Sequence, residues 1–165
     1  MSALIILDTA LADVDALVAE AAEYLARRLG GVPPLDPASL PRDAAGALTA
    51  IDAWAGTDVS NWRSELTRWF EMSAPVRLVP DPELNGILRR AAKAGTRLGC
   101  ASALTTESLE LTLQQLGCAR AFVASAAGDG SLHDAVSAVQ AALGEHDTPV
   151  ASTRAEVVAA LTAHP

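Results

Sequence analysis

The sequence is poor in basic residues, and this excludes two classes of partner. Lys93 is the only lysine among 165 residues, and 12 basic side chains stand against 20 acidic ones, a formal net charge of −8. An acidic surface repels phosphate backbones and anionic lipid headgroups. The composition therefore predicts no nucleic-acid partner and no membrane partner.

Long apolar runs and paired cysteines are also missing. No apolar stretch approaches the roughly 18 residues that a membrane-spanning helix needs. The apolar start, Met1–Leu7, runs directly into Asp8 without a basic segment or a small-residue cleavage site. The only two cysteines, Cys100 and Cys118, stand in apolar contexts and are expected to be buried thiols. We therefore expect a soluble, cytoplasmic protein.

Several catalytic signatures are absent as well. The sequence contains no Gly-x-Ser-x-Gly elbow, no Gly-x-Gly-x-x-Gly and no P-loop. The three histidines, His133, His146 and His164, are scattered and have no cysteine or carboxylate array beside them. This spacing predicts no metal site.

What the sequence does contain is a regular alternation of strands and helices. Four apolar runs predict buried strands, at residues 3–7, 97–101, 121–124 and 149–151. Helical spacing separates the later runs, and Thr153 with Glu156 predicts a capping box for the last helix. This rhythm predicts an α/β domain with a parallel sheet and helices on both faces.

A helical insertion interrupts the alternation after the first strand. Its three helices are predicted at residues 14–29, 44–54 and 60–72. We therefore expect an α/β core of residues 1–13 and 76–165, and a small helical cap of residues 14–75. Ligands of open α/β sheets bind at the carboxyl ends of the strands. A cleft between cap and core is expected there.

The cap holds most of the aromatic residues. Trp62, Leu66 and Trp69 recur at the spacing of one helix face, with Phe70 beside them. One interpretation packs this face on the first cap helix. A thin cap can hardly bury all of these side chains, however. We therefore predict an exposed apolar surface that binds a second copy or another protein through Trp62, Leu66, Trp69 and Phe70.

The order of elements resembles a known family. The strand and acidic turn IILDTALAD is followed by the helical insertion, and then by AAKAGTRLGCAS and LGCARAFVAS. Over residues 3–144 this is similar to haloacid dehalogenase-like (HAD) hydrolases with a small helical cap. The resemblance implies a Rossmann-like core. It also implies a first strand ending in Asp-x-Asp-Gly-Thr-Leu-x-Asp, whose first Asp attacks phosphorus and whose second Asp is the acid or base.

The catalytic positions of that motif are altered in this chain. A gapless comparison matches Leu11 and Asp13 to the trailing residues, gives Asp8 the acid/base position and places Ile6 where the nucleophile belongs. An alkyl side chain cannot attack phosphorus. An alternative alignment makes Asp8 the nucleophile and loses the second Asp to Ala10. Asp8 and Asp13 are thus the catalytic candidates.

The other motifs of the family are incomplete. Ser102 matches the phosphate-binding hydroxyl, but Gly130 stands where the family has lysine. The acidic magnesium turn is missing, and only Glu145 and Asp147 remain near its place. A phosphate would therefore meet net negative charge. Like charges about 4 Å apart cost about 4 kcal/mol at an effective dielectric of roughly 20. Magnesium and other cofactors are not expected.

Two functions remain open from the sequence. The first is a catalytically inactive HAD-like pseudoenzyme that binds a protein or a small ligand. The second is a HAD-like hydrolase or other enzyme with altered chemistry that uses Asp8. The predicted ligand contacts are Asp8, Ser102, Asp129 and Ser131, the last two in a turn whose amides can bind an anion. Helix capping is the simpler explanation for Asp129 or Ser131, and for Asp13 and Asp15.

Overall fold

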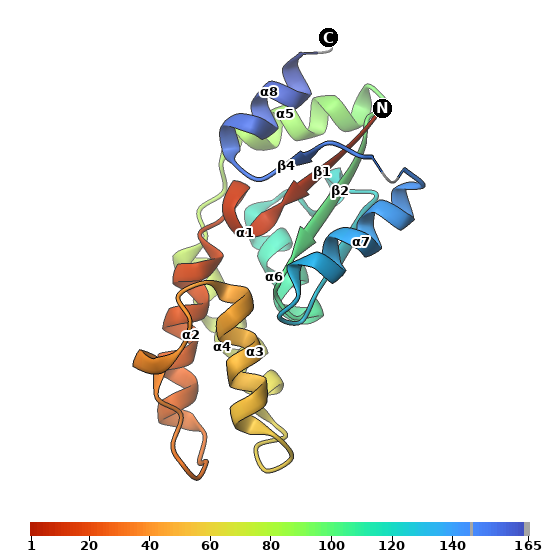
Figure 1. Cartoon of the computed structure of the whole chain (residues 1–165). Helices are drawn as coiled ribbons and strands as arrows, with labels where there is room; N and C mark the ends of the chain where they lie inside the picture. The colour runs from red at the N-terminus through yellow and green to blue at the C-terminus, as the bar shows by residue number, and fades with distance from the viewer. Residues whose placement is uncertain (146, 164–165) are drawn as a thin grey trace.

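A parallel β-sheet forms the centre of the molecule. The structure is a computed structural model that describes residues 1–145 and 147–163, so His146 and His164 lie outside the described residues. The strand order is β3-β2-β1-β4 and every pairing is parallel. The strands are β1 (Ser2–Ile6), β2 (Arg97–Ser102), β3 (Ala124–Ala127) and β4 (Val150–Ala151). The predicted α/β class with a parallel, Rossmann-like sheet is confirmed (Figure 1).

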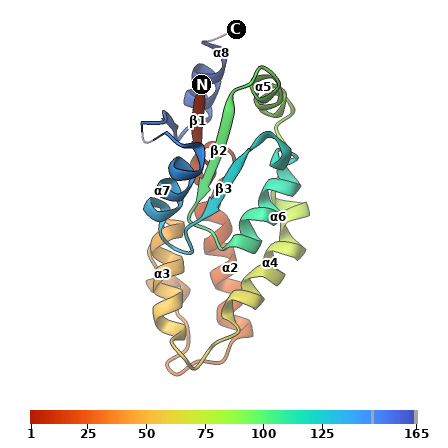
Figure 2. The same ribbon diagram turned by 90° about the vertical axis from the view of Figure 1, so that its right-hand side faces the viewer.

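Helices cover both faces of the sheet, and the alternation of side chains in β1 shows why. Leu4 and Ile6 pack with Ala135, Val139 and Leu143 of helix α7 (Leu132–Leu143). Ala3 and Ile5 point to the opposite face and join the larger core. The same core includes buried residues of α5 (Pro82–Lys93), α6 (Thr106–Leu116) and α8 (Arg154–Thr162). Figure 2 shows α7 on one side of the sheet and α5 and α6 on the other.

Gly99 explains how closely α7 approaches the sheet. A Cβ atom at this position of β2 would lie 2.3 Å from Cγ1 of Val139. Such a contact is far shorter than van der Waals separation, so any side chain here would push the helix away. The glycine therefore permits tight packing of α7 against β2.

Two predicted boundaries are wrong in detail. The third strand begins at Ala124 rather than at residue 121, because residues Ala119–Ala121 form a 3₁₀ turn and Phe122 and Val123 lead into the strand. β3 is at the edge of the sheet, so small, half-buried residues suffice for it. The first strand ends at Ile6, after which Leu7–Ala10 form the short helix α1.

The helical insertion lies beside the carboxyl ends of the strands. It consists of α2 (Val14–Arg28), α3 (Ala44–Ala55) and α4 (Trp62–Arg77), with a 3₁₀ turn at Pro37–Ser39. The chain enters it after α1 and returns to the core before α5 (Figure 1). α4 is longer than predicted and continues through Pro75. Within the described residues, no helix is both long and apolar enough to cross a membrane.

The predicted exposed aromatic surface is wrong. Trp62, Leu66, Trp69 and Phe70 are all buried, and none is more than 6% exposed. The rings of Trp69 and Phe70 meet edge to face at 5.1 Å. The physical reason is that α4 packs on both α2 and α6, so the core as well as the cap covers its apolar face. These residues hold the insertion on the core instead of offering a surface to a partner.

Candidate functional site

Asp8 is the centre of the candidate site. It follows the end of β1, and Ser102 ends the neighbouring β2. Parallel strands end at the same edge of a sheet, which brings the two side chains together. The Ser102 hydroxyl donates to Oδ1 of Asp8, and the Ala103 amide donates to Oδ2 at 2.9 Å. Both carboxylate oxygens therefore accept a hydrogen bond from the β2 end.

Burial controls the acidity of Asp8. Its side chain is only 7% exposed. Desolvation raises the pKa of the Asp8 carboxyl above its ordinary value of 3.8, and the nearby charge of Asp15 acts in the same direction. The hydrogen bonds from Ser102 and Ala103 lower the pKa but do not cancel the effect of burial. Asp8 thus holds its proton more readily than an exposed aspartate.

A cavity of about 330 Å³ opens over Asp8 between core and insertion. Core residues Ile6, Thr9, Leu132 and Ser152 line it together with Asp8, and Asp15, Asp43, Ala44 and Ala45 come from the insertion. We call it the Asp8 cavity. Every ionisable side chain that lines it among the described residues is an aspartate, so its interior favours cations over anions.

The acidic residues of the cavity already have structural roles. Asp15 accepts a hydrogen bond from the Ala44 amide at 2.8 Å, which fixes the beginning of α3 against α2. Asp43 caps the same helix by accepting from the Gly46 amide at 2.7 Å. Across the described residues, no set of three or more His, Cys, Asp or Glu side chains is arranged to hold a metal ion. The cavity is thus acidic but is not shaped as a metal centre.

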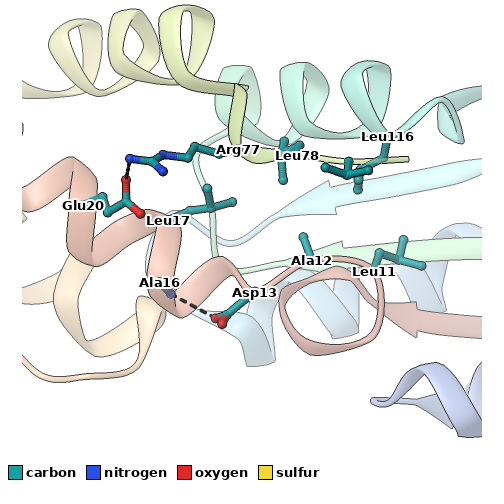
Figure 3. Close-up of a pocket in the computed structure, with 10 residues that line it drawn as sticks. Leu11, Ala12, Asp13, Ala16, Leu17, Glu20, Arg77, Leu78 and Leu116 are labelled. Carbon is teal, nitrogen blue, oxygen red and sulfur yellow. Dashed lines mark hydrogen bonds and ion pairs between the residues drawn. The ribbon is translucent and has the colours of Figure 1, made fainter. Parts of the chain in front are cut away.

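Asp13 does not join Asp8, although the sequence placed both in one motif. Asp13 caps α2 by accepting from the Ala16 amide at 3.0 Å. It lines a separate cavity of about 260 Å³ where the two connections between core and insertion meet, shown in Figure 3 with Leu17, Leu78 and Leu116. Asp13 is therefore explained as a helix cap, and its side chain does not lie in the same cavity as Asp8.

The four predicted ligand-binding residues do not line one cavity. Ser102 is completely buried and does not line the Asp8 cavity, so it orients Asp8 rather than contacting a ligand. Ser131 caps α7 by accepting from the Asp134 amide at 3.3 Å. Asp129 is absent from the cavity lining as well. Of the four predicted contacts, only Asp8 faces the cavity.

Asp129 instead binds Arg63 of α4. Two guanidinium nitrogens donate to Asp129 Oδ2, at 2.7 and 3.1 Å. A third guanidinium nitrogen of Arg63 lies 3.0 Å from Oδ1 of Asp52 on α3, and the guanidinium stacks 4.3 Å from the Trp62 ring centroid. We call this set the Arg63 bridge. It joins α3, α4 and the loop between β3 and α7.

A close contact between α3 and the same loop explains Gly130. The Thr49 hydroxyl donates to the Gly130 carbonyl at 3.2 Å. A Cβ atom on Gly130 would lie 2.8 Å from Thr49 Oγ1, and the residue has φ +97°. Both facts favour glycine. A lysine at this position would strain the backbone and force the Thr49 side chain to shift.

Comparisons with family models and with curated protein sequences found no match for this chain. The function must therefore be argued from the geometry of the site.

Sequence reasoning missed half of the Asp8 cavity. Asp43 and Ser152 were not singled out, because one precedes a cap helix and the other follows a two-residue strand. Their meeting depends on how α3 docks on the core, which no local pattern encodes. Nothing in the sequence marks Arg63 as a residue that joins the insertion to the core. Its signal is weak, since an isolated arginine in a helix is normally solvated.

Proposed function

We propose that this protein is a HAD-like domain without phosphoryl-transfer chemistry that binds a small neutral or cationic molecule in the Asp8 cavity. The observation that carries the proposal is the charge of the cavity. Its ionisable lining, among the described residues, consists of Asp8, Asp15 and Asp43. A phosphate group would enter a field of its own sign, whereas an ammonium group or a hydrogen-bond donor would find acceptors.

The surroundings of Asp8 add support to the loss of catalysis. Under the gapless alignment the nucleophile position is Ile6, which is buried at the end of β1. Under the alternative alignment Asp8 is the nucleophile, yet both of its oxygens already accept hydrogen bonds. These hydrogen bonds make the two oxygens weaker nucleophiles, and burial, which raises the pKa of Asp8, disfavours the charged form that would attack.

The lysine and the acidic magnesium turn, which neutralise phosphate charge in HAD hydrolases, are replaced by other residues in this chain. Gly130 cannot be replaced by the family's lysine without a clash with Thr49. β4 lies beside β1 and ends at Ala151. The amide and hydroxyl of the next residue, Ser152, donate to Glu156 at 2.7 and 2.9 Å. Glu156 also completes the capping box of α8. The Glu156 carboxylate beside this strand end is thus engaged in capping.

One observation favours the enzymatic alternative. A buried carboxyl whose pKa is raised, beside a cavity, is a typical general acid. In this second function Asp8 donates a proton to a substrate bound in the cavity, without a metal. Its proton would have to leave while the Ser102 and Ala103 hydrogen bonds remain, because these bonds stabilise the carboxylate that is formed.

Ligand-dependent thermal stability tests the proposed function. We expect a panel of small diamines to raise the melting temperature in a saturable manner, and inorganic phosphate at millimolar concentration to leave it unchanged. A ligand at about 100 times its Kd adds about 2.7 kcal/mol to the free energy of unfolding. The rise should shrink in Asp43→Asn, because asparagine keeps the helix cap and removes only the charge.

The matched control is Asp36→Asn. Asp36 caps the 3₁₀ turn in the same way but does not line the Asp8 cavity. The control should respond to diamines as the wild type does. A saturable rise with phosphate, or equal responses of Asp43→Asn and Asp36→Asn, would contradict the proposal.

A further inference from the structure

A further cavity, of about 470 Å³, lies at the other end of the sheet from the Asp8 cavity. Arg89 of α5 forms one side of it, and the end of α6 with the segment that leads to β3 forms the other, through Gln114 and residues 117–121. This segment precedes the amino end of β3, whereas Asp8 follows the carboxyl end of β1. Figure 2 shows α5 and the start of β3 away from the helical insertion. We call this space the Arg89 cavity.

The charge of the Arg89 cavity is opposite in sign to that of the whole protein. Arg89 and Arg120 line it, and no carboxylate does so among the described residues. Cys118 also lines it, but burial raises the pKa of this thiol to about 11, so the sulfur stays neutral at physiological pH. In a chain with a net charge of −8, the cavity is therefore a local positive site.

The two guanidinium groups of the cavity also lack a carboxylate partner. In the part of the chain that the structure describes, neither Arg89 nor Arg120 forms an ion pair, whereas five other arginines do: Arg27, Arg28, Arg63, Arg77 and Arg154. Nε of Arg89 donates to the Asn85 carbonyl at 3.1 Å, one turn earlier in α5. This bond orients the Arg89 side chain and leaves its terminal nitrogens to donate to an acceptor in the cavity. The uncompensated charge favours an anionic group there.

The rest of the lining is small and largely apolar. Gly117, Cys118, Ala119 and Ala121 contribute backbone, methyl groups and a neutral thiol, and Gln114 adds one polar side chain. Such a surface covers a hydrocarbon body better than it satisfies the several oxygens of an inorganic anion. The volume lies within the range of about 300–1,000 Å³ that is typical of small-molecule sites.

We propose that the Arg89 cavity binds a small organic carboxylate. Its carboxylate group lies between the guanidinium groups of Arg89 and Arg120, and its hydrocarbon part lies against Ala119 and Ala121. The planar fork of a guanidinium matches the two oxygens of a carboxylate. Exposed ion pairs are individually weak, so the apolar contact is needed to retain the ligand, and inorganic phosphate is not held. This site is separate from the Asp8 cavity, whose aspartates favour cations.

Fluorine NMR of para-fluorobenzoate tests the proposal with the whole chain. We expect saturable line broadening of this probe, and weaker binding as the sodium chloride concentration rises. Arg89→Gln and Arg120→Gln should each weaken the binding about three- to fivefold, as expected for the loss of one exposed ion pair. Both side chains are exposed, so both variants should keep the fold, which circular dichroism verifies.

The matched control is Arg90→Gln. Arg90 is the next residue of α5 and is exposed, but it does not line the cavity. Its substitution removes the same charge from the same helix and should leave the affinity for para-fluorobenzoate unchanged. The uncharged probe para-fluorobenzamide should bind more weakly than the benzoate and should not respond to Arg89→Gln.

Two results would overturn the proposal. One is the absence of saturable para-fluorobenzoate binding by the wild-type chain. The other is an equal affinity of the wild type, Arg89→Gln and Arg120→Gln for this probe. Neither result bears on the binding of diamines in the Asp8 cavity, because Arg89 and Arg120 do not line that cavity.

Discussion

At the scale of single residues, Asp8 shows how position and environment act together. The sequence predicts that Asp8 and Ser102 meet, because both follow parallel strands that end at one edge. It does not predict that Ser102 is completely buried and binds Asp8 rather than a ligand. That outcome depends on the Ala103–Thr105 segment, which is buried over the strand end. The sequence therefore predicts where Asp8 and Ser102 lie, but the segment around them decides that Ser102 binds Asp8 instead of a ligand.

The raised pKa of Asp8 predicts a pH dependence of stability. A folded-state pKa above the unfolded value of 3.8 means that protonated Asp8 favours folding. This contribution is complete below the unfolded pKa and is lost as the pH rises through the folded pKa. Asn at position 8 stays neutral, so the melting temperature of Asp8→Asn should rise relative to that of the wild type as the pH increases above about 4.

The control for this measurement is Asp58→Asn, which removes an exposed carboxylate remote from the Asp8 cavity. Its melting curve should follow the wild type over the same pH range. If the difference between Asp8→Asn and wild type does not change with pH, then the pKa of Asp8 is not raised by burial.

At the scale of elements, periodicity predicted the helices well and their partners poorly. Thr153 and Glu156 form the predicted capping box because that motif is local. The apolar spacing correctly predicts that Trp62, Leu66 and Trp69 share one face of α4. It does not predict that α6 covers this face, because α6 is distant in the sequence. β3 was misplaced by three residues for a related reason. Its ASAA sequence carries little strand signal of its own.

Truncation of Trp62 tests the corrected account of α4. Because Trp62 is 2% exposed within the core, Trp62→Ala should lower the free energy of unfolding by about 3–5 kcal/mol. Val76→Ala is the matched control on the same helix, since Val76 is 75% exposed and should change stability by less than about 0.5 kcal/mol. Denaturant titration measures both. If Trp62→Ala is as stable as Val76→Ala, then Trp62 is not buried in the core.

At the scale of the whole molecule, charge and topology lead to the same conclusion. The chain carries a net charge of −8, and the cavity at the strand ends is lined by aspartates. The sheet order places β4 beside β1, so Ser152 rather than an acidic turn stands next to Asp8. Composition alone had predicted an acidic protein with little affinity for phosphate. The position of α3 beside the site depends on the complete fold, and no single segment of the sequence indicates it.

The most direct test of the account is magnesium-dependent hydrolysis of an aryl phosphate by the wild-type chain and by Asp8→Asn. We predict no turnover above buffer for either protein, because the proposed HAD-like alignment puts Ile6 at the nucleophile position and Gly130, which contacts Thr49, at the lysine position. Turnover by the wild type that requires magnesium and disappears in Asp8→Asn would contradict the account. It would identify Asp8 as the nucleophile of a working phosphatase.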